Sequence, residues 1–411
     1  MPMNAIEKIL ARHSEQAVVR PGDVVMVDVD VTVQFDHARS DVLKIANPEK
    51  LVMVHDHVVP APTVQAANNA KRMRDFVERF GIENYFPVGK HGISHVIVAE
   101  NGFALPGQIL ANADSHTCSS GAMNCLARGM GGPEMLYILC KGQTWFPVGA
   151  TTKVVLEGSL PKRVYPRDVI HYIPGTYGDF AGRNLEWYGE GLSTIGMDGR
   201  LTMATISAEL SAEFSLFPYD DVLRDYLEGR ARWPFEPAFP DDDAGYEQTI
   251  TINLSALEPQ VVLPDRVAWN TKGAGEVATE RIKVDQAFIG SCANGRISDF
   301  AVAAEILRGK TIAPGTRMIV TPGSQDILKE AIRLGYVETL MDAGAVVTNS
   351  TCGACFGGHM GLLADDEVCI TASTRNFKGR MGSPLASVYM GSPATVAASA
   401  LSGYIADPRE F

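Results

Sequence analysis

Cysteines are the residues of this sequence that most directly suggest chemistry, and two of them form a C-x-x-C pair. Cys352 and Cys355 follow a short apolar segment, residues 345–347, which predicts a strand. Gly357 and Gly358 come next and allow the backbone to wrap closely. A pair with this spacing suits zinc, a redox dithiol or an iron-sulfur cluster, and spacing alone does not choose among them.

A third cysteine, Cys292, lies in the loop after another predicted strand, residues 284–289. Two adjacent strand-end loops would bring three thiols together at one sheet edge. Three thiolates without a fourth suit a cluster with one metal open to substrate. The simpler alternative is that Cys292 is a small buried apolar side chain. The other cysteines lie among apolar or small residues and are predicted to be core: Cys118, Cys125, Cys140 and Cys369.

Histidines beside carboxylates form the second group of candidates. Asp56 precedes His57, Asp114 and Ser115 precede His116, and His95 stands alone. A carboxylate can orient an imidazole and raise its basicity, which prepares it for general acid work. Neighbours on a strand point to opposite faces, so the pair at 56–57 is also consistent with coincidence.

Two arginines form the third group. Arg375 and Arg380 follow the predicted strand at residues 367–371, and Phe377 between them indicates a packed loop. Arginine grips a carboxylate through two parallel hydrogen bonds, so the pair predicts an acidic ligand. A solvated face is the alternative.

The composition agrees with an enzyme for small molecules. The chain has 411 residues, 36 Lys plus Arg and 48 Asp plus Glu, and a net charge of −12. Without a basic run, nucleic acid and anionic membranes are not expected partners. No apolar run reaches the ~18 residues of a membrane span, and residues 1–16 predict an amphipathic helix rather than a signal peptide. The expected location is the cytoplasm, or an organelle matrix if a presequence is removed.

Alternating strand and helix patterns predict an α/β fold. The expected strands and helices are, in order, strands at 24–33 and 51–54, a helix at 64–80, a strand at 153–156, a helix at 201–216, a strand at 284–289, a helix at 297–307, a strand at 318–320, a helix at 325–334, and strands at 345–347 and 367–371. Residues 233–243, with three prolines and three aspartates, predict a surface loop.

Taken together, these segments resemble the aconitase superfamily, and within it the large subunits of 3-isopropylmalate dehydratases. The resemblance extends over residues 6–410. The motifs that carry it are D-S-H-T at 114–117, I-G-S-C-A-N-G-R at 289–296, C-G-A-C followed by G-G-H-M-G at 352–361, S-T-R-N-F-K-G-R-M-G at 373–382, and the closing helix at 392–400.

The resemblance implies a core of three α/β domains, at 1–147, 148–262 and 263–411, around a central cluster. It implies that Cys292, Cys352 and Cys355 ligate a 4Fe-4S cluster with one open iron. The resemblance also implies acid/base or hydrogen-bonding roles at seven positions and substrate-carboxylate binding at two. The seven are Asp56, His57, His95, Asp114, Ser115, His116 and Glu209, and the two are Arg375 and Arg380.

The implied reaction is reversible removal of water from a 2-hydroxy di- or tricarboxylic acid, with His57 or His116 as the proton donor. In this family the base that takes the α-proton is a serine on a swivelling fourth domain. That domain is expected to be absent here and to be supplied by a separate small subunit.

Departures from the family motifs leave the substrate open. They fall at residues 29–32 and 118–120, at Thr205 and at Thr374. Alternatives to 3-isopropylmalate dehydratase are homoaconitase and the 2-methylmalate, dimethylmalate and maleate hydratases. A rival from another class is a cluster-free RNA-binding regulator, which the intact cysteines and acidic charge disfavour.

Overall fold

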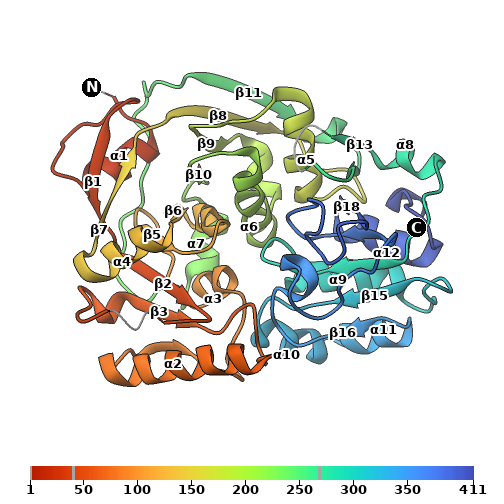
Figure 1. Cartoon of the computed structure of the whole chain (residues 1–411). Coiled ribbons are helices and arrows are strands. Elements are labelled where there is room, and N and C mark those ends of the chain that lie inside the picture. The colour runs from red at the N-terminus through yellow and green to blue at the C-terminus, as the bar shows by residue number, and fades with distance from the viewer. Residues whose placement is uncertain (1, 39–41, 267–269) are drawn as a thin grey trace.

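The computed structural model describes residues 2–38, 42–266 and 270–411, and in these residues the chain forms four β-sheets (Figure 1). In Figure 1 the first third of the chain, red to yellow, lies on the left, and the last third, cyan to blue, lies on the right. The helix α6 stands between them. The predicted α/β class is confirmed, since the sheets are largely parallel and alternate with helices.

The first sheet has five parallel strands in the order β4-β3-β2-β5-β6. Its strands are β4 (Asn84–Phe86), β3 (Leu51–Val54), β2 (Val31–Phe35), β5 (Ile109–Asn112) and β6 (Leu126–Gly129). All four residues of β3 are buried, as expected for a strand covered on both faces. The expected strand at 24–33 proved to be two strands, because β1 (Val24–Asp28) pairs instead with β7 (Gln143–Pro147) in a separate ribbon.

The second sheet is parallel, in the order β10-β9-β8-β11. Its strands are β8 (Ala150–Glu157), β9 (Arg183–Tyr188), β10 (Ser215–Leu216) and β11 (Gln248–Asn253). The third sheet has seven strands in the order β13-β12-β18-β17-β14-β15-β16, of which the last five are parallel. These are β12 (Gln260–Val262), β13 (Thr271–Gly273), β14 (Gln286–Ile289), β15 (Arg317–Val320), β16 (Val346–Val347), β17 (Val368–Thr371) and β18 (Ser387–Gly391).

Helices cover these sheets, and local signals define their ends. The helix α2 begins after Thr63, whose hydroxyl accepts from the amide of Ala66, and ends at Gly81, which has a φ of 63°. The helices are α1 (Ala5–Arg12), α2 (Val64–Phe80), α3 (Ser94–Glu100), α4 (Gly132–Lys141), α5 (Pro166–Tyr177), α6 (Met197–Ile206), α7 (Asp221–Leu227), α8 (Ala274–Thr279), α9 (Ile297–Leu307), α10 (Gln325–Arg333), α11 (Tyr336–Asp342) and α12 (Pro393–Ser402). The expectations for α2 and α9 are confirmed residue for residue.

The predicted helix over residues 201–216 was wrong. The helix α6 ends at Ile206 and passes into a short 3₁₀ turn, η4 (Ser207–Leu210). Ser211 then takes a left-handed conformation with a φ of 61°, which stops the helix, and residues 215–216 join β9 as the strand β10. Apolar residues continue through the segment because the turn and the strand are buried too, so hydrophobicity alone did not mark the break.

The apolar core connects the first two sheets. One cluster of buried side chains includes Val31 and Val33 of the first sheet, Val154 of the second, and Trp187. A second cluster surrounds the third sheet and includes Phe300 of α9. The strand β12 lies in the second predicted domain, residues 148–262, but pairs with β18 of the third. The three-domain division stays a prediction.

The segment at 233–243 contains no helix or strand. It lies partly over the core, because Ala238 is buried and Trp233 and Phe235 pack against apolar residues.

Within the described chain, none of the helices combines the length and the apolar character that crossing a membrane requires.

Candidate active site

The candidate residues lie where strand ends of the first and third sheets face each other. In the first sheet, Asp36 follows β2, Asp56 and His57 follow β3, and Asp114 follows β5. These strands are parallel and adjacent, so their carboxyl ends and the polar side chains after them lie at one edge. Because the pair at 56–57 comes after the strand has ended, the alternation of faces along a strand does not separate the two side chains.

The third sheet contributes the cysteines and arginines from the carboxyl ends of its parallel strands. Cys292 follows β14, Cys352 follows β16, and Arg375 follows β17. The two cysteine loops meet at one cavity, as predicted, although their strands are not neighbours, because β15 lies between β14 and β16. The loop after β16 therefore has to cross the end of β15 to reach Cys292.

Gly353 makes that crossing possible. It has a φ of 58°, and a Cβ atom there would lie 3.0 Å from Oγ1 of Thr321 and 3.1 Å from the ring of Phe288. Thr321 follows β15, and its hydroxyl lies 2.8 Å from that of Thr348 at the start of the crossing loop. A side chain at Gly353 would push the C-x-x-C loop away from the sheet.

A cavity of about 280 Å³ lies between the two sets of loops. Ten of the twelve predicted site residues line it: His57, His95, Asp114, Ser115, His116, Cys292, Cys352, Cys355, Arg375 and Arg380. The other two, Asp56 and Glu209, contact residues of this lining from behind. The structure thus brings the predicted site residues together, although their individual roles stay predictions.

Glu209 ties a histidine to an arginine. Its Oε1 accepts from Nε2 of His116 at 2.9 Å and from Nε of Arg375 at 2.7 Å. The pKa of Glu209 is lowered, since these two partners outweigh the effect of burial. Burial disfavours a charge on His116, but the sulfur of Cys292 and the carboxylates of Asp114 and Glu209 raise its pKa well above the usual value. His116 is therefore prepared to carry a proton at neutral pH.

Asp114 links His95 to the backbone of His116. Its Oδ1 accepts from Nε2 of His95 at 2.8 Å and from the backbone amide of His116 at 2.8 Å. Burial would raise the pKa of Asp114, but hydrogen bonds from His116 and His95 lower it well below its ordinary value. The ionised form of Asp114 can hold the ring of His95 and the backbone of His116 in place. Ser115 lies beside it and is exposed.

His57 is held on several sides. Its ring stacks on Phe35 and meets Phe356 edge to face, with 5.1 Å between ring centroids in both cases. The carboxylate of Asp36 accepts from the backbone amides of Asp56 and His57 at 2.8 and 2.7 Å. Despite burial, Cys352 and Asp56 raise the pKa of His57 well above its usual value.

Among the described residues, the guanidinium of Arg380 has no hydrogen-bond or carboxylate partner. Its Nε is buried and makes no hydrogen bond to any described residue. It also acts on Cys355: burial would raise the pKa of that thiol, but Arg380 and bonds to Thr374 lower it. An unpaired cation on a cavity wall is suited to a ligand carboxylate.

The three cysteines fit a cluster better than a single ion. All are buried, and none is in a disulfide. In the described chain, their sulfur atoms do not all lie within the 4.8 Å of one another that a single ion requires. A cluster binds each thiolate through a different iron, so it accommodates wider spacing. Cys118, Cys125 and Cys369 are buried elsewhere, as predicted for core, and Cys140 is half-buried.

Three residues at the site were not predicted from the sequence. Asp36, Ile93 and Phe356 belong to the cavity or support it. Asp36 stands directly after an apolar strand, the same placement that drew attention to Cys292, and that signal could have found it. Ile93 and Phe356 look like ordinary core residues in the sequence. Only their position at the cavity wall distinguishes them.

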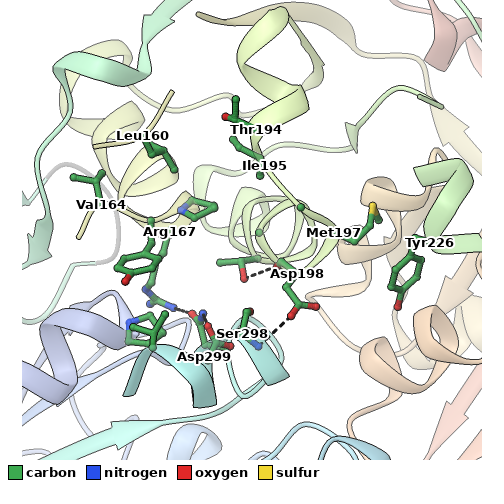
Figure 2. Close-up of a pocket in the computed structure, with 18 residues that line it drawn as sticks. Leu160, Val164, Arg167, Thr194, Ile195, Met197, Asp198, Tyr226, Ser298 and Asp299 are labelled. Atoms are coloured by element: carbon green, nitrogen blue, oxygen red, sulfur yellow. Dashed lines mark hydrogen bonds between the residues drawn. The ribbon is translucent and has the colours of Figure 1, made fainter. Parts of the chain in front are cut away.

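A larger cavity of about 580 Å³ lies between α5, α6 and α9 (Figure 2). Figure 2 shows Leu160, Val164, Ile195 and Met197 around it, with few charged groups. Arg167 connects the two regions. It is fully buried and donates to Oδ1 of Asn294 and to the carbonyl of Ala372, both at 2.6 Å, and to the carbonyl of Ser373.

Comparisons with known proteins show which family the chain belongs to. The sequence profile of the aconitase family (aconitate hydratase) matches residues 7–279 and 265–403. The chain is 51% identical over 414 residues to the 3-isopropylmalate dehydratase large subunit of Mycolicibacterium smegmatis, covering 100% of this chain and 98% of the relative. It is 40% identical over 421 residues to the protein of the same name from Halothermothrix orenii, with 100% of both chains covered.

Among solved structures, the aconitase X of Thermococcus kodakaraensis shares the fold, with a TM-score of 0.50 and 13% identity over 91% of this chain and 89% of the other. The extent of the sequence match is decisive for the family, because both the profile and the relatives span nearly the whole chain. The chain therefore belongs to the aconitase family of hydro-lyase enzymes, as its motifs predicted.

Proposed function

We propose that this chain is the large, cluster-bearing subunit of a 3-isopropylmalate dehydratase, which interconverts 2-isopropylmalate and 3-isopropylmalate through dehydration and rehydration. The observation that carries the proposal is the convergence of three thiols, three imidazoles and two arginines on one cavity of about 280 Å³. The 51% identity to a relative of that name supports this substrate over those of other family members.

Cys292, Cys352 and Cys355 would hold a 4Fe-4S cluster. When bound, such a cluster supplies a Lewis-acidic iron with an open position for the substrate hydroxyl. Thiolates rather than thiols ligate iron, and the pKa of Cys355 is lowered, which favours its thiolate, whereas burial raises the pKa of Cys352.

The arginines would bind and orient the substrate. Arg375 uses its Nε on Glu209, and none of the described residues accepts a hydrogen bond from its terminal nitrogens. Arg380 has a buried, unpaired Nε. Two unpaired guanidinium edges on one cavity suit the two carboxylates of a 2-hydroxy diacid.

An imidazole would protonate the departing hydroxyl. His116 has the stronger case, because Glu209 and Asp114 hold its ring from two sides and favour its charged form. His57 is the second candidate, with a ring held between Phe35 and Phe356. Asp114 would keep His95 and His116 oriented through its Oδ1.

A separate small subunit would complete the enzyme by supplying the base for the α-proton. The relatives that match along the whole chain are named large subunits, which supports a second chain. The expected place of this enzyme is the cytoplasm.

The test is to reconstitute the purified chain with iron and sulfide under anaerobic conditions, add a co-expressed small subunit, and follow the absorbance of the unsaturated product. The expected kcat/KM is highest for 2-isopropylmalate among 2-hydroxy diacids, including homoaconitate and 2-methylmalate, and activity is absent in Cys352→Ser. A chain that binds its full cluster but dehydrates none of these acids would refute the proposal.

A further inference from the structure

One set of three side chains in the site has the spacing of a mononuclear metal centre. Asp56, His57 and Cys352 each offer a ligand atom, and these atoms all lie within 4.8 Å of one another. No other set of three among the described carboxylates, histidines and cysteines meets that spacing. The three cysteines expected to hold the cluster are not such a set.

The two distances from Asp56 to the other members of this set fit tetrahedral zinc. Bonds of about 2.0 Å to oxygen or nitrogen and about 2.3 Å to sulfur place neighbouring ligand atoms about 3.3 to 3.5 Å apart. Oδ1 of Asp56 lies 3.2 Å from Nδ1 of His57 and 3.7 Å from Sγ of Cys352. A carboxylate oxygen, an imidazole and a thiolate are also the ligand types that zinc takes.

The surroundings hold these atoms in place. The other oxygen of Asp56, Oδ2, accepts from the amide of Ser94 at 2.7 Å, which leaves Oδ1 facing Cys352. Thr351, next to Cys352, donates from Oγ1 to the carbonyl of His57 at 2.7 Å and so ties the two loops together. Such supporting bonds orient metal ligands.

Nδ1 of His57 lies near two carboxylates, 3.2 Å from Oδ1 of Asp56 and 3.5 Å from Oδ2 of Asp36. Nδ1 is buried and makes no aligned hydrogen bond to any described residue. Nε2 lies 3.9 Å from Oδ2 of Asp114, on the side away from Asp56. With Nδ1 as the ligand atom, Nε2 faces the carboxylate of Asp114, and a carboxylate on the side of the second ring nitrogen is the usual support of a metal-ligating histidine. The His57 side chain is 19% exposed, which gives an ion a way in.

We propose that the chain, when it carries no cluster, binds a single divalent transition metal of the zinc class through Asp56, His57 and Cys352. The same thiolate of Cys352 cannot serve this ion and a cluster at once. Bound zinc therefore competes with cluster assembly. The metal site itself stands independently of the proposed function, and only the competition rests on it.

The first experiment measures metal binding by the cluster-free full-length chain. Titration with Zn²⁺, and with Co²⁺ for its thiolate charge-transfer absorbance, is expected to give one equivalent per chain. Asp56→Asn, His57→Gln and Cys352→Ser are each expected to weaken binding at least tenfold. Cys292→Ser and Cys355→Ser are matched controls and are expected to keep the affinity within threefold. Equal losses in the controls, or unchanged affinity in Asp56→Asn and His57→Gln, would overturn the proposal.

A measurement on the unaltered chain does not depend on how the variants fold. X-ray absorption of the zinc-loaded chain is expected to show one sulfur and two or three nitrogen or oxygen neighbours. Three sulfur neighbours would overturn the site, because the ion would then lie among the cluster cysteines.

The competition is read from iron bound per chain after anaerobic reconstitution, with and without one equivalent of Zn²⁺. Zinc is expected to lower iron incorporation at least threefold in the unaltered chain and not in Asp56→Asn. Full incorporation of iron in the presence of bound zinc would refute the competition. A chain that binds zinc as expected but never takes up iron would instead refute the cluster proposal and leave the metal site standing.

Discussion

Two cavities of this protein differ in volume and in chemistry, and the smaller one has the more reactive side chains. The larger, of about 580 Å³, is lined mainly by apolar side chains such as Leu160 and Met197 (Figure 2). The smaller, of about 280 Å³, holds three histidines, three cysteines and two arginines. Charged groups gather where parallel strands end, and there they raise and lower one another's pKa values. Histidines and cysteines thus line the smaller of these two cavities and not the larger one.

The sharpest test of this comparison is one substitution in each cavity. His116→Gln keeps a hydrogen-bonding side chain beside Glu209 but cannot carry the proton, so kcat is expected to fall about 100- to 10,000-fold. Val302→Ala in the wall of the larger cavity is expected to change kcat less than threefold. Steady-state rates of the reconstituted two-subunit enzyme measure both. A loss of kcat of similar size in the two variants would contradict the expectation that catalysis depends on the smaller cavity and not on the larger one.

A smaller effect is expected at the arginines of the small cavity. Lysine keeps the charge but lacks the planar fork, so Arg375→Lys and Arg380→Lys are each expected to lose one charge-assisted hydrogen bond of roughly 1.5 to 3 kcal/mol. That loss lowers kcat/KM by about 10- to 150-fold at normal iron content. Lys378→Met, an exposed change in the same loop, is the control. An arginine whose lysine variant keeps full kcat/KM does not bind the substrate.

Arg167 connects the two cavities, and its loss is expected to affect stability before chemistry. Arg167→Met leaves Asn294 and two backbone carbonyls without their donor, which is expected to cost about 1 to 3 kcal/mol of unfolding free energy. Arg167→Lys, which retains a buried donor, is expected to recover part of that loss. Urea unfolding of the cluster-free chain measures both. A methionine variant as stable as the unaltered chain would show that the guanidinium only fills space.

The smallest effect is expected at Glu100, at the opposite end of α3 from His95. Burial raises the pKa of Glu100 to about 7. A carboxyl group with a raised pKa in the folded state costs stability as the pH rises from its unfolded value toward the folded one, and the cost persists above it. Glu100→Gln is therefore expected to gain about 1 kcal/mol of stability at pH 8, and to gain nothing at pH 4.

Thermal unfolding at the two pH values, with kcat as a control, checks the Glu100 prediction. Glu100 does not line the small cavity, so kcat is expected to stay within twofold. An equal gain in stability at both pH values would show that the carboxylate charge is not the cause.

Local patterns predicted much of the fold. The helices expected at 64–80 and 297–307 match α2 and α9. The local patterns failed at residues 201–216, where buried apolar residues such as Leu210 and Phe214 recur beyond the end of the helix. Ser211, where the backbone turns left-handed, is a single polar residue that does not by itself predict the end of a helix.

Much of the candidate site could be predicted because residues with reactive or charged side chains follow predicted strands in the sequence. The C-x-x-C loop, Cys292 and the arginine loop each follow a strand in the sequence itself. Asp36 was missed although it follows β2 in the same way, because a lone aspartate after a strand is common in turns. Ile93 and Phe356 were missed because an apolar residue carries no mark of the cavity it faces.

By itself, the amino-acid sequence determined the family, the α/β class and the residue types that the chemistry needs, because these are properties of local order along the chain. Only the tertiary structure decided which of those residues meet. Glu209 contacts His116 across 93 residues and Arg375 across 166, and β15 separates two strands whose loops join above it. Strand order and loop crossings set these contacts, and both depend on packing between segments that the chain connects only at a distance.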